Sequence, residues 1–350
     1  MTHDEADATI SGDPGVPDAA VAWFRAHVPG LSGEPTFRRI TGGRSNLTYR
    51  VSDDAGTTWA LRRPPMGGVL ETAHDMSREW RFLSALAPTD VPVPVPVAFC
   101  DDRDVAGVDF YVMDFAPGRV LNSPSDADWV TSSEVKTRIG ESTMDVLAAL
   151  HAVEPAEVGL DDLARPGNFV ERQLKRWHRQ AHSSALEDLS AIDEAHAALA
   201  ERVPEAPANR IVHGDFRSGN ISYAEDGRAV AVFDWELATI GDPYCDLGHV
   251  LVSWSQPGDT VPAALPNPTE AGGFPTREDL LARYESASGA KLPDIDFYIA
   301  FARWRAACIH AGVWTRYQAG DMGEAEDADE VTGPEAIDAQ ARSAVDQLRM

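Results

Sequence analysis

The chain has 350 residues, which is enough for one large domain or for two lobes with separate cores. Hydrophobic residues make up 43% of it, a fraction too high for a disordered protein. Its 56 acidic residues outnumber its 30 basic ones, and the formal net charge of -26 excludes nucleic-acid binding through a basic surface.

The acidic residues are spread along the whole chain, and arginine supplies nearly all of the positive charge. This pattern predicts a halophilic protein kept soluble at high salt, where screening shortens the reach of charge repulsion. The alternative is an acidic field that attracts a cationic substrate, which requires the acids to cluster around one cleft.

Residues 1–17 are predicted to form a disordered leader, because they are acidic and lack the apolar segment of a signal peptide. No run of 18 apolar residues occurs, so we expect no membrane contact. Cys100, Cys245 and Cys308 are isolated and are expected to be buried apolar residues, with no disulfide or zinc role. These features predict a cytoplasmic protein.

Strand patterns dominate the first third of the chain. A helix is predicted over 18–27, strands over 37–40, 47–51, 57–62 and 108–113, and an amphipathic helix over 73–87. The alternating valines and prolines of 91–97 must be extended. We expect Ala116-Pro117-Gly118 to be a hinge between a nucleotide-binding lobe, 18–115, and a catalytic and substrate-binding lobe, 116–350.

The part after the hinge is mainly helical. Helical patterns cover 133–153, 169–200, 276–288, 296–318 and 334–348. Two short apolar strands, 220–223 and 230–233, interrupt them, with Asp226-Gly227 as the turn. The predicted fold class is therefore α+β, with a small antiparallel-sheet lobe followed by a larger, mainly helical lobe.

The strongest chemical signal is the segment IVHGDFRSGN, residues 211–220. Asp215 precedes Asn220 by five residues, and Asp234 ends an apolar strand 14 residues further on. Phosphoryl transfer needs a carboxylate that orients the attacking hydroxyl and accepts its proton. It also needs an amide oxygen and a second carboxylate that hold Mg²⁺ against the nucleotide phosphates. Each short motif alone is typical of a turn, whereas their combination favours this chemistry.

The runs HGDFRSGN and VFDWELATIGDPYCDLGHVL, together with the spacing above, resemble the aminoglycoside phosphotransferase and choline-kinase-like family. The similarity is greatest to the branch also found fused to acyl-CoA dehydrogenases, and it extends from about Phe37 to about Gln318. It implies a two-lobed protein-kinase-like fold and an ATP- and Mg²⁺-dependent kinase that acts on a small-molecule hydroxyl.

The resemblance also implies roles for individual residues. Asp215 corresponds to the catalytic aspartate, and Asn220 and Asp234 to the magnesium ligands. Arg217 is expected near the γ-phosphate. The expected supporting residues are His213 and Asp246, which brace the catalytic loop, and Glu236, which either touches a second metal or is an exposed carboxylate.

In the N-terminal lobe, Gly42, Gly43, Ser45 and Asn46 lie between two predicted strands. Glycines there allow backbone N–H groups to approach phosphate oxygens, although a plain hairpin turn has the same composition. In the context of the family, this segment resembles the nucleotide loop. The segment Met113-Asp114-Phe115 fits the part of the hinge whose backbone is expected to meet adenine; the alternative there is an ordinary strand end.

One departure from the family concerns the third strand, where kinases of this fold usually carry a lysine. Arg62 occupies that place, and no lysine precedes Lys136. Arginine keeps the charge and binds phosphate bidentately, so we expect Arg62 to serve, with Glu79 as its partner. The alternative for Glu79 is a solvated helix carboxylate.

The acceptor cannot be identified from these patterns, and the family implies either a hydroxyacid or hydroxyacyl thioester, or an aminoglycoside or amino alcohol. Aromatic residues near the C-terminus either line its pocket or belong to the core; they are Trp254, Tyr298, Trp304, Trp314 and Tyr317. A nucleotide-binding pseudokinase scaffold without turnover is the alternative function. A protein kinase is disfavoured, because D-F-G and A-P-E motifs are missing.

Overall fold

A computed structural model describes residues 15–40, 46–65, 75–259, 267–320 and 333–349. The predicted loop residues Gly42, Gly43 and Ser45, and residues 1–14 of the predicted leader, lie outside these ranges. The chain forms two compact units. The first comprises Met1–Pro117 and Ala231–Glu236, and the second Gly118–Val230 and Leu237–Met350. The segment that contains Asp234 therefore belongs to the N-terminal unit.

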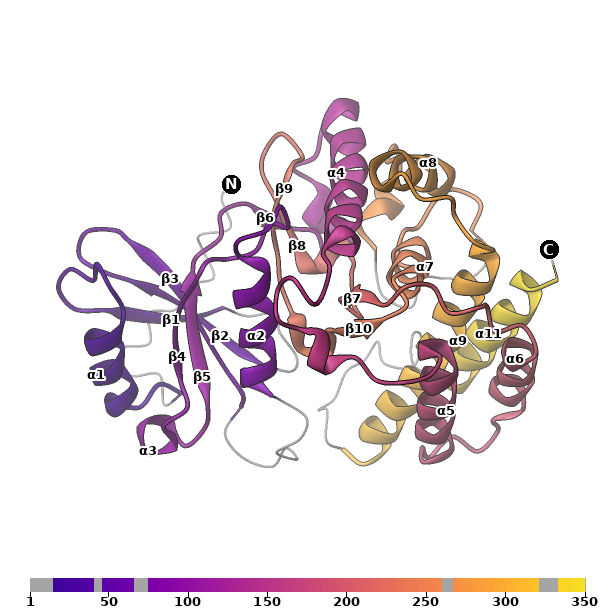
Figure 1. The fold of residues 1–350 in the computed structure, drawn as a ribbon, viewed down its shortest axis with the longest axis horizontal. Helices are drawn as coiled ribbons and strands as arrows, with labels where there is room; N and C mark the ends of the chain where they lie inside the picture. Colours follow the sequence, from indigo (N-terminus) through magenta and orange to yellow (C-terminus); the bar gives the residue numbers. More distant parts are fainter. Residues whose placement is uncertain (1–14, 41–45, 66–74, 260–266, 321–332, 350) are drawn as a thin grey trace. The chain divides into compact units, whose positions relative to one another are not determined.

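The N-terminal unit is built on one antiparallel sheet of five strands in the order β1-β2-β3-β5-β4 (Figure 1). Its strands are β1 (Thr36–Ile40), β2 (Leu47–Ser52), β3 (Thr58–Arg63), β4 (Pro96–Cys100) and β5 (Phe110–Asp114). Its helices are α1 (Asp18–His27), α2 (Met76–Leu86) and the short α3 (Arg103–Ala106). The predicted strands and both longer helices are present, and the extended segment 91–97 leads into β4.

The two faces of the sheet have separate cores, because successive side chains of a strand point to opposite sides. Trp59 and Leu61 of β3 pack with Phe24 of α1 on one face. Ala60 packs with residues of α2 on the other face, including Leu83. By this alternation Arg62 lies on the α2 face and Arg63 on the α1 face, so the two neighbouring arginines have different surroundings.

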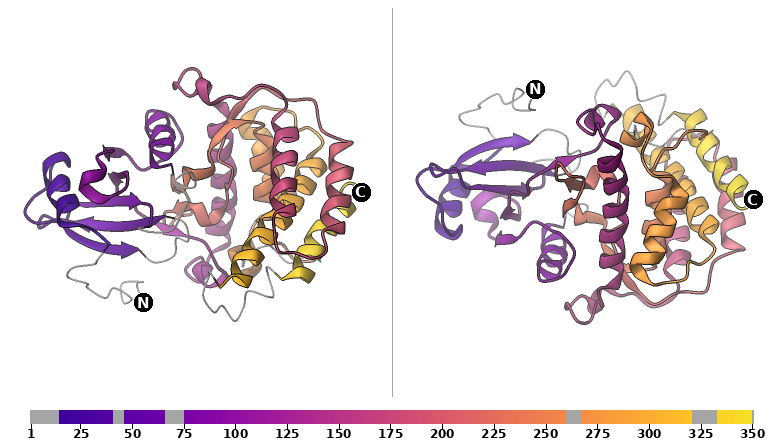
Figure 2. Two further views of the ribbon diagram at one scale, coloured as in Figure 1. Left: turned by 90° about the horizontal axis from the view of Figure 1, so that it is seen from below. Right: turned by 90° about the horizontal axis from the view of Figure 1, so that it is seen from above.

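Helices make up most of the C-terminal unit, which Figure 2 shows from two further directions. Its long helices are α4 (Ser133–Ala152), α5 (Phe169–His182), α6 (Ser190–Ala200), α7 (Tyr244–Val252), α8 (Arg277–Ser288), α9 (Ile295–Gln318) and α11 (Pro334–Gln347). Its short strands are β6 (Arg119–Val120), β7 (Arg210–Val212), β8 (Ile221–Tyr223), β9 (Ala229–Val232) and β10 (Thr239–Gly241). Its single 3-10 turns are η1 (Pro124–Ala127), η2 (Asp161–Leu163), η3 (Ser218–Asn220) and η5 (Pro268–Ala271), whereas η4 (Trp235–Leu237) begins in the segment that belongs to the N-terminal unit. Strand β10 pairs with β7, and β8 pairs with β6, both antiparallel.

The core of this unit lies among α5, α6, α7, α9 and α11. Trp304 and Tyr298 of α9 are almost completely buried in it, and Trp254, just after α7, is also buried. Trp314 packs against the same core from its edge. The sequence left open whether these aromatic residues line an acceptor pocket or belong to the core. The structure shows that these four belong to the core or pack against it. Tyr317, at the end of α9, is partly exposed.

One helical prediction for this unit needs correction, and one helix of the unit is additional to those predicted. The pattern over 169–200 is two helices, because α5 ends at His182. The hydroxyls of Ser183 and Ser184 donate to the carbonyls of Arg179 and Ala181, and such side-chain bonds compete with continuation of a helix. Helix α7 was not predicted, because its sequence YCDLGHVLV contains a glycine and no amphipathic repeat.

The three cysteines are free and buried, as predicted. Among the helices within the described ranges, none has the length and apolar character required to cross a bilayer.

Candidate active site

The segment predicted to be the catalytic loop begins directly after β7, and one buried carboxylate fixes its backbone. Asp246, in the first turn of α7, accepts hydrogen bonds from the backbone N–H of His213 at 2.6 Å and of Gly214 at 2.8 Å. Gly214 has a φ of +85°, and a Cβ there would lie 2.8 Å from the carbonyl oxygen of Leu237. Only glycine fits this conformation, so the loop can place Asp215 in one orientation.

Asp215 is held by side chains from three directions. Nε2 of His249, on α7, lies 2.9 Å from its Oδ1, and Nδ2 of Asn220 donates to its Oδ2 at 2.8 Å. Nε of Arg217 is 3.5 Å from Oδ2. The Asp215 side chain is still 30% exposed, so a substrate group can reach it. Because the Asn220 nitrogen is used on Asp215, its amide oxygen points elsewhere and is suited to a cation.

Although burial opposes ionisation, the hydrogen bond and charge of His249, together with Arg217 and His213, hold the pKa of Asp215 well below its ordinary value. The carboxylate is therefore charged at every physiological pH.

Two residues of this group were missed by the sequence analysis. His249 follows Asp246 by three residues, so on a helix the two lie on the same side, and that spacing was the available signal. Asn122 accepts from Nη1 of Arg217 at 2.9 Å. Asn122 lies 95 residues before Arg217, and no local pattern marks it.

In the N-terminal unit, Glu79 of α2 is the centre of a second polar cluster. It is 1% exposed, which rules out the solvated alternative. Its Oε2 accepts from Nε of Arg62 and from the hydroxyl of Tyr111, both at 2.8 Å, and its Oε1 accepts from Nδ2 of Asn46 at 2.8 Å. The predicted Arg62–Glu79 pair is therefore present, and Asn46 joins it.

Arg62 also reaches Asp234, since its Nη2 lies 2.5 Å from Asp234 Oδ1. Burial opposes the charge of Arg62, but the carboxylate of Glu79 and the neighbouring Tyr111 and Asp234 raise its pKa, so the guanidinium stays charged. Glu79, Asp234 and Glu236 each offer a carboxylate oxygen within 4.8 Å of the others. This set of hard oxygen donors suits Mg²⁺.

Asp234 has an unusual backbone. Its φ is +66°, and among the described residues it is the only non-glycine residue with a positive φ. Such a conformation costs on the order of 1 kcal/mol for a residue with a Cβ, and it recurs at functional sites. Asp234 stands between β9 and the single turn η4, so the left-handed residue makes the sharp change of direction that presents its carboxylate to Arg62.

The remaining predicted residues lie at the end of the central strands. Met113 is buried in β5, where it pairs with Ala60 of β3. Phe115, just after β5, packs under the guanidinium of Arg50 at 4.8 Å. Asp215, Arg217 and Asn220 are thus brought together in one unit, and Asn46, Arg62, Glu79 and Asp234 in the other.

The first prediction separates the two arginines of β3. Arg62→Met leaves the buried Glu79 charge without its cation, so we expect a loss of about 3–5 kcal/mol in the free energy of unfolding. Arg62→Lys should be intermediate, because it keeps the charge but loses the planar fork.

Arg63→Met is the matched control. The Arg63 side chain is 3% exposed and lies over the ring of Tyr49, and its Nε and Nη1 have no hydrogen-bond partner in the described structure. Arg63→Met should leave the free energy of unfolding, measured by urea denaturation, unchanged or higher. A larger loss of this free energy for Arg63→Met than for Arg62→Met contradicts the pairing of Arg62 with Glu79.

The second prediction concerns Asp242, just before α7, which accepts from the Tyr298 hydroxyl at 2.8 Å. Burial raises its pKa to about 6, although hydrogen bonds from Tyr298 and the Tyr244 N–H oppose the rise. The protonated form therefore contributes stability that is complete below pH ~4 and lost as the pH rises through 6. Relative to Asp242→Asn, the natural protein should lose on the order of 3 kcal/mol between pH 4 and 7. Urea denaturation of both proteins across this range measures the difference; a pH-independent difference contradicts the prediction.

The comparisons with known proteins agree with this geometry. Residues 36–277, more than half of the chain, match a family model described as the phosphotransferase enzyme family. Human acyl-CoA dehydrogenase family member 11 is 30% identical over 308 residues, which make up 86% of this chain but 39% of the human protein. The chain thus spans about two fifths of the length of that relative.

Solved structures show the same fold. A Ralstonia eutropha protein provisionally named an aminoglycoside phosphotransferase has a TM-score of 0.78 and 32% identity, covering 94% of this chain and 98% of that chain. A thermostable mutant of an aminoglycoside phosphotransferase, in ternary complex with AMP-PNP and hygromycin B, shares the fold at a TM-score of 0.60 and 16% identity, covering 93% and 98% of the two chains.

These likenesses confirm the predicted α+β, two-lobed, kinase-like fold and the resemblance on which it was based. With the family model covering residues 36–277, the chain belongs to the phosphotransferase enzyme family.

Proposed function

We propose that the protein transfers the γ-phosphate of ATP, in the presence of Mg²⁺, to a hydroxyl group of a small molecule. The observation that carries this proposal is the Asp215 carboxylate, which His249, Asn220 and Arg217 hold in place while part of it stays accessible. A charged carboxylate fixed in this way can accept a hydrogen bond from an alcohol and so aim its oxygen at a phosphoryl group.

In this reaction the acceptor oxygen forms a bond to the γ-phosphorus, and the bond between that phosphorus and the β–γ bridging oxygen breaks. The hydroxyl proton passes to Asp215, and the products are ADP and a phosphate monoester. Arg217 offsets charge on the transferring group; its guanidinium is oriented by Asn122 and Asp215.

Asn220 and Asp234 are the proposed magnesium ligands, and Glu236 is an additional carboxylate close to Asp234. Their hard oxygens fit Mg²⁺, which neutralises phosphate charge when bound. Arg62 is the proposed phosphate anchor, since its charge is maintained by Glu79. The buried Oδ1 of Asn46 has no hydrogen-bond partner in the described structure, which suits a residue beside a ligand site.

For the nucleotide we propose ATP, held also by Gly42, Gly43 and Ser45 and by the backbone around Met113 and Phe115. The solved structure of the same fold described above contains AMP-PNP, an analogue of ATP, which supports this choice. For the acceptor we propose a hydroxyacid or hydroxyacyl thioester, because the curated relatives are named acyl-CoA dehydrogenase family members. An aminoglycoside or amino alcohol is the alternative, supported by the Ralstonia eutropha structure.

A screen of alcohols for acceptor-dependent ADP formation tests the function. Because the acidic composition predicts a halophilic cytoplasmic protein, the assay should include molar KCl. Binding of ATP with no ADP formation for any acceptor would favour the pseudokinase scaffold.

The third prediction concerns Asp215. Asp215→Asn should keep ATP affinity within about threefold of the natural protein and lower the rate of phosphoryl transfer by a factor on the order of 10² or more, because positioned acid–base groups contribute ~10²–10⁴. Calorimetry measures the affinity, and the ADP assay the rate. Glu225→Gln, at an exposed position in the following turn, is the control and should be silent. Near-normal turnover of Asp215→Asn removes Asp215 from the mechanism.

The fourth prediction concerns the metal. Asp234→Ala should abolish the increase in ATP affinity that Mg²⁺ gives the natural protein, since a proposed ligand is lost. Asp101→Ala, at an exposed surface position, is the control. Titrations of ATP with and without Mg²⁺ are the measurement, and equal metal enhancement in Asp234→Ala and the natural protein refutes the assignment.

A further inference from the structure

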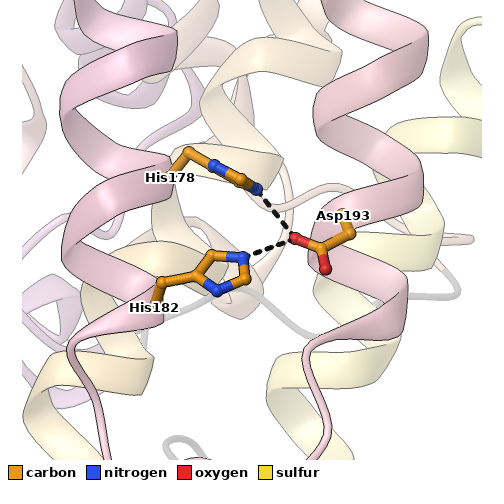
Figure 3. Close-up of side chains that lie close together, drawn as sticks. All are labelled: His178, His182 and Asp193. Atoms are coloured by element: carbon orange, nitrogen blue, oxygen red, sulfur yellow. Dashed lines mark hydrogen bonds and ion pairs between the residues drawn. The ribbon is translucent and has the colours of Figure 1, made fainter.

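Histidines and an aspartate face one another across two helices of the C-terminal unit. His178 and His182 are four residues apart on α5, so they lie on the same side of that helix. Asp193, on the adjacent α6, points between them (Figure 3). None of these residues belongs to the candidate active site.

The three side chains converge on a single atom. Nε2 of His178 lies 2.7 Å and Nε2 of His182 lies 2.8 Å from the same oxygen of Asp193, Oδ1. The potential ligand atoms of all three residues lie within 4.8 Å of one another. The side chains are 30%, 44% and 47% exposed, so an ion and a water molecule can enter from solvent.

Two ion pairs between charged histidines and Asp193 explain this convergence poorly. The two imidazole rings have centroids 4.4 Å apart, so charging both of them places like charges side by side. Exposed ion pairs also contribute little stability, about 0–1 kcal/mol. A divalent cation removes the conflict, because it binds neutral imidazoles and an ionised carboxylate at the same point.

A neighbouring ring also holds one of the potential ligands in place. His196 stacks on His178 with ring centroids 4.0 Å apart and planes 18° apart, which fixes the His178 ring.

We propose that His178, His182 and Asp193 form a binding site for Zn²⁺ that links α5 to α6, with water as the fourth ligand. A set of two imidazole nitrogens and one carboxylate oxygen binds Zn²⁺ in preference to Mg²⁺. Zinc–ligand bonds of about 2.0–2.2 Å in a tetrahedron separate the ligand atoms by about 3.3–3.5 Å. The present contacts of 2.7 and 2.8 Å therefore need to open by about 0.5–0.8 Å to reach this separation.

The test is a zinc titration of the full chain, free of any polyhistidine tag, by competition with a chromogenic chelator. Millimolar Mg²⁺ is present to occupy carboxylate sites. We expect one zinc per chain with a dissociation constant below about 10 µM, and a rise in melting temperature on zinc addition. Affinity should fall on acidification, because protons compete with the metal for imidazole nitrogens.

Two variants locate the ion. His182→Ala and Asp193→Asn should each weaken zinc binding at least about tenfold and abolish the rise in melting temperature. His182 is the last residue of α5 and exposed, so its loss should leave the fold intact, which circular dichroism checks.

The controls distinguish other sites. His27→Ala removes an exposed histidine of the N-terminal unit, and Asp234→Ala removes a carboxylate of the proposed magnesium site; both should bind zinc normally. The proposal is refuted if the natural protein shows no saturable binding, or if His182→Ala and Asp193→Asn bind zinc as tightly as it does. Because every readout is binding or melting, this result does not depend on the proposed kinase activity.

Discussion

The position of Asp215 depends on the contact between the buried carboxylate of Asp246 and two successive backbone N–H groups, those of His213 and Gly214. Two such hydrogen bonds compensate a buried charge only if the peptide planes of His213 and Gly214 keep one orientation. The carbonyl of Gly214 is bound in turn by the guanidinium of Arg305 on α9. Helices α7 and α9 thus fix both backbone groups of Gly214, and the next residue is Asp215.

The N-terminal unit also contains a buried carboxylate, that of Glu79, but side chains rather than backbone N–H groups hold it. Three side-chain donors, from Arg62, Tyr111 and Asn46, share the two oxygens of the Glu79 carboxylate. Because every donor comes from a different strand or loop, the carboxylate ties the sheet to α2. The planar guanidinium of Arg62 donates to Glu79 and to Asp234 from two nitrogens whose relative positions are fixed. The ammonium of a lysine has a single nitrogen and does not fix the two contacts in this way. Arginine on the third strand is therefore compatible with an intact site.

The sequence predicted most of the sheet and the long helices, because period-two and three-to-four spacings are local signals. It failed where a local pattern competes with a side-chain bond, as at Ser183 and Ser184, or where tertiary packing decides, as at α7. Gly248 illustrates the second case: a Cβ there would lie 2.4 Å from the carbonyl oxygen of Tyr298, so its glycine serves helix packing. Asn122 and the His178–His182–Asp193 cluster required residues that meet only after folding.

The strongly lowered pKa of Asp215 bears on how such a carboxylate can act. A group that weakly holds a proton is a poor base toward an alcohol, whose proton is far less acidic in the ground state. In a loose transition state for phosphoryl transfer the acceptor oxygen has formed little bond, so its proton becomes acidic only late. In the proposed reaction, Asp215 therefore acts first by orienting the hydroxyl and receives the proton at the end. The hydrogen bonds from His249 and Asn220 fit orientation first and proton transfer last, because they fix the direction of the carboxylate and lower its basicity.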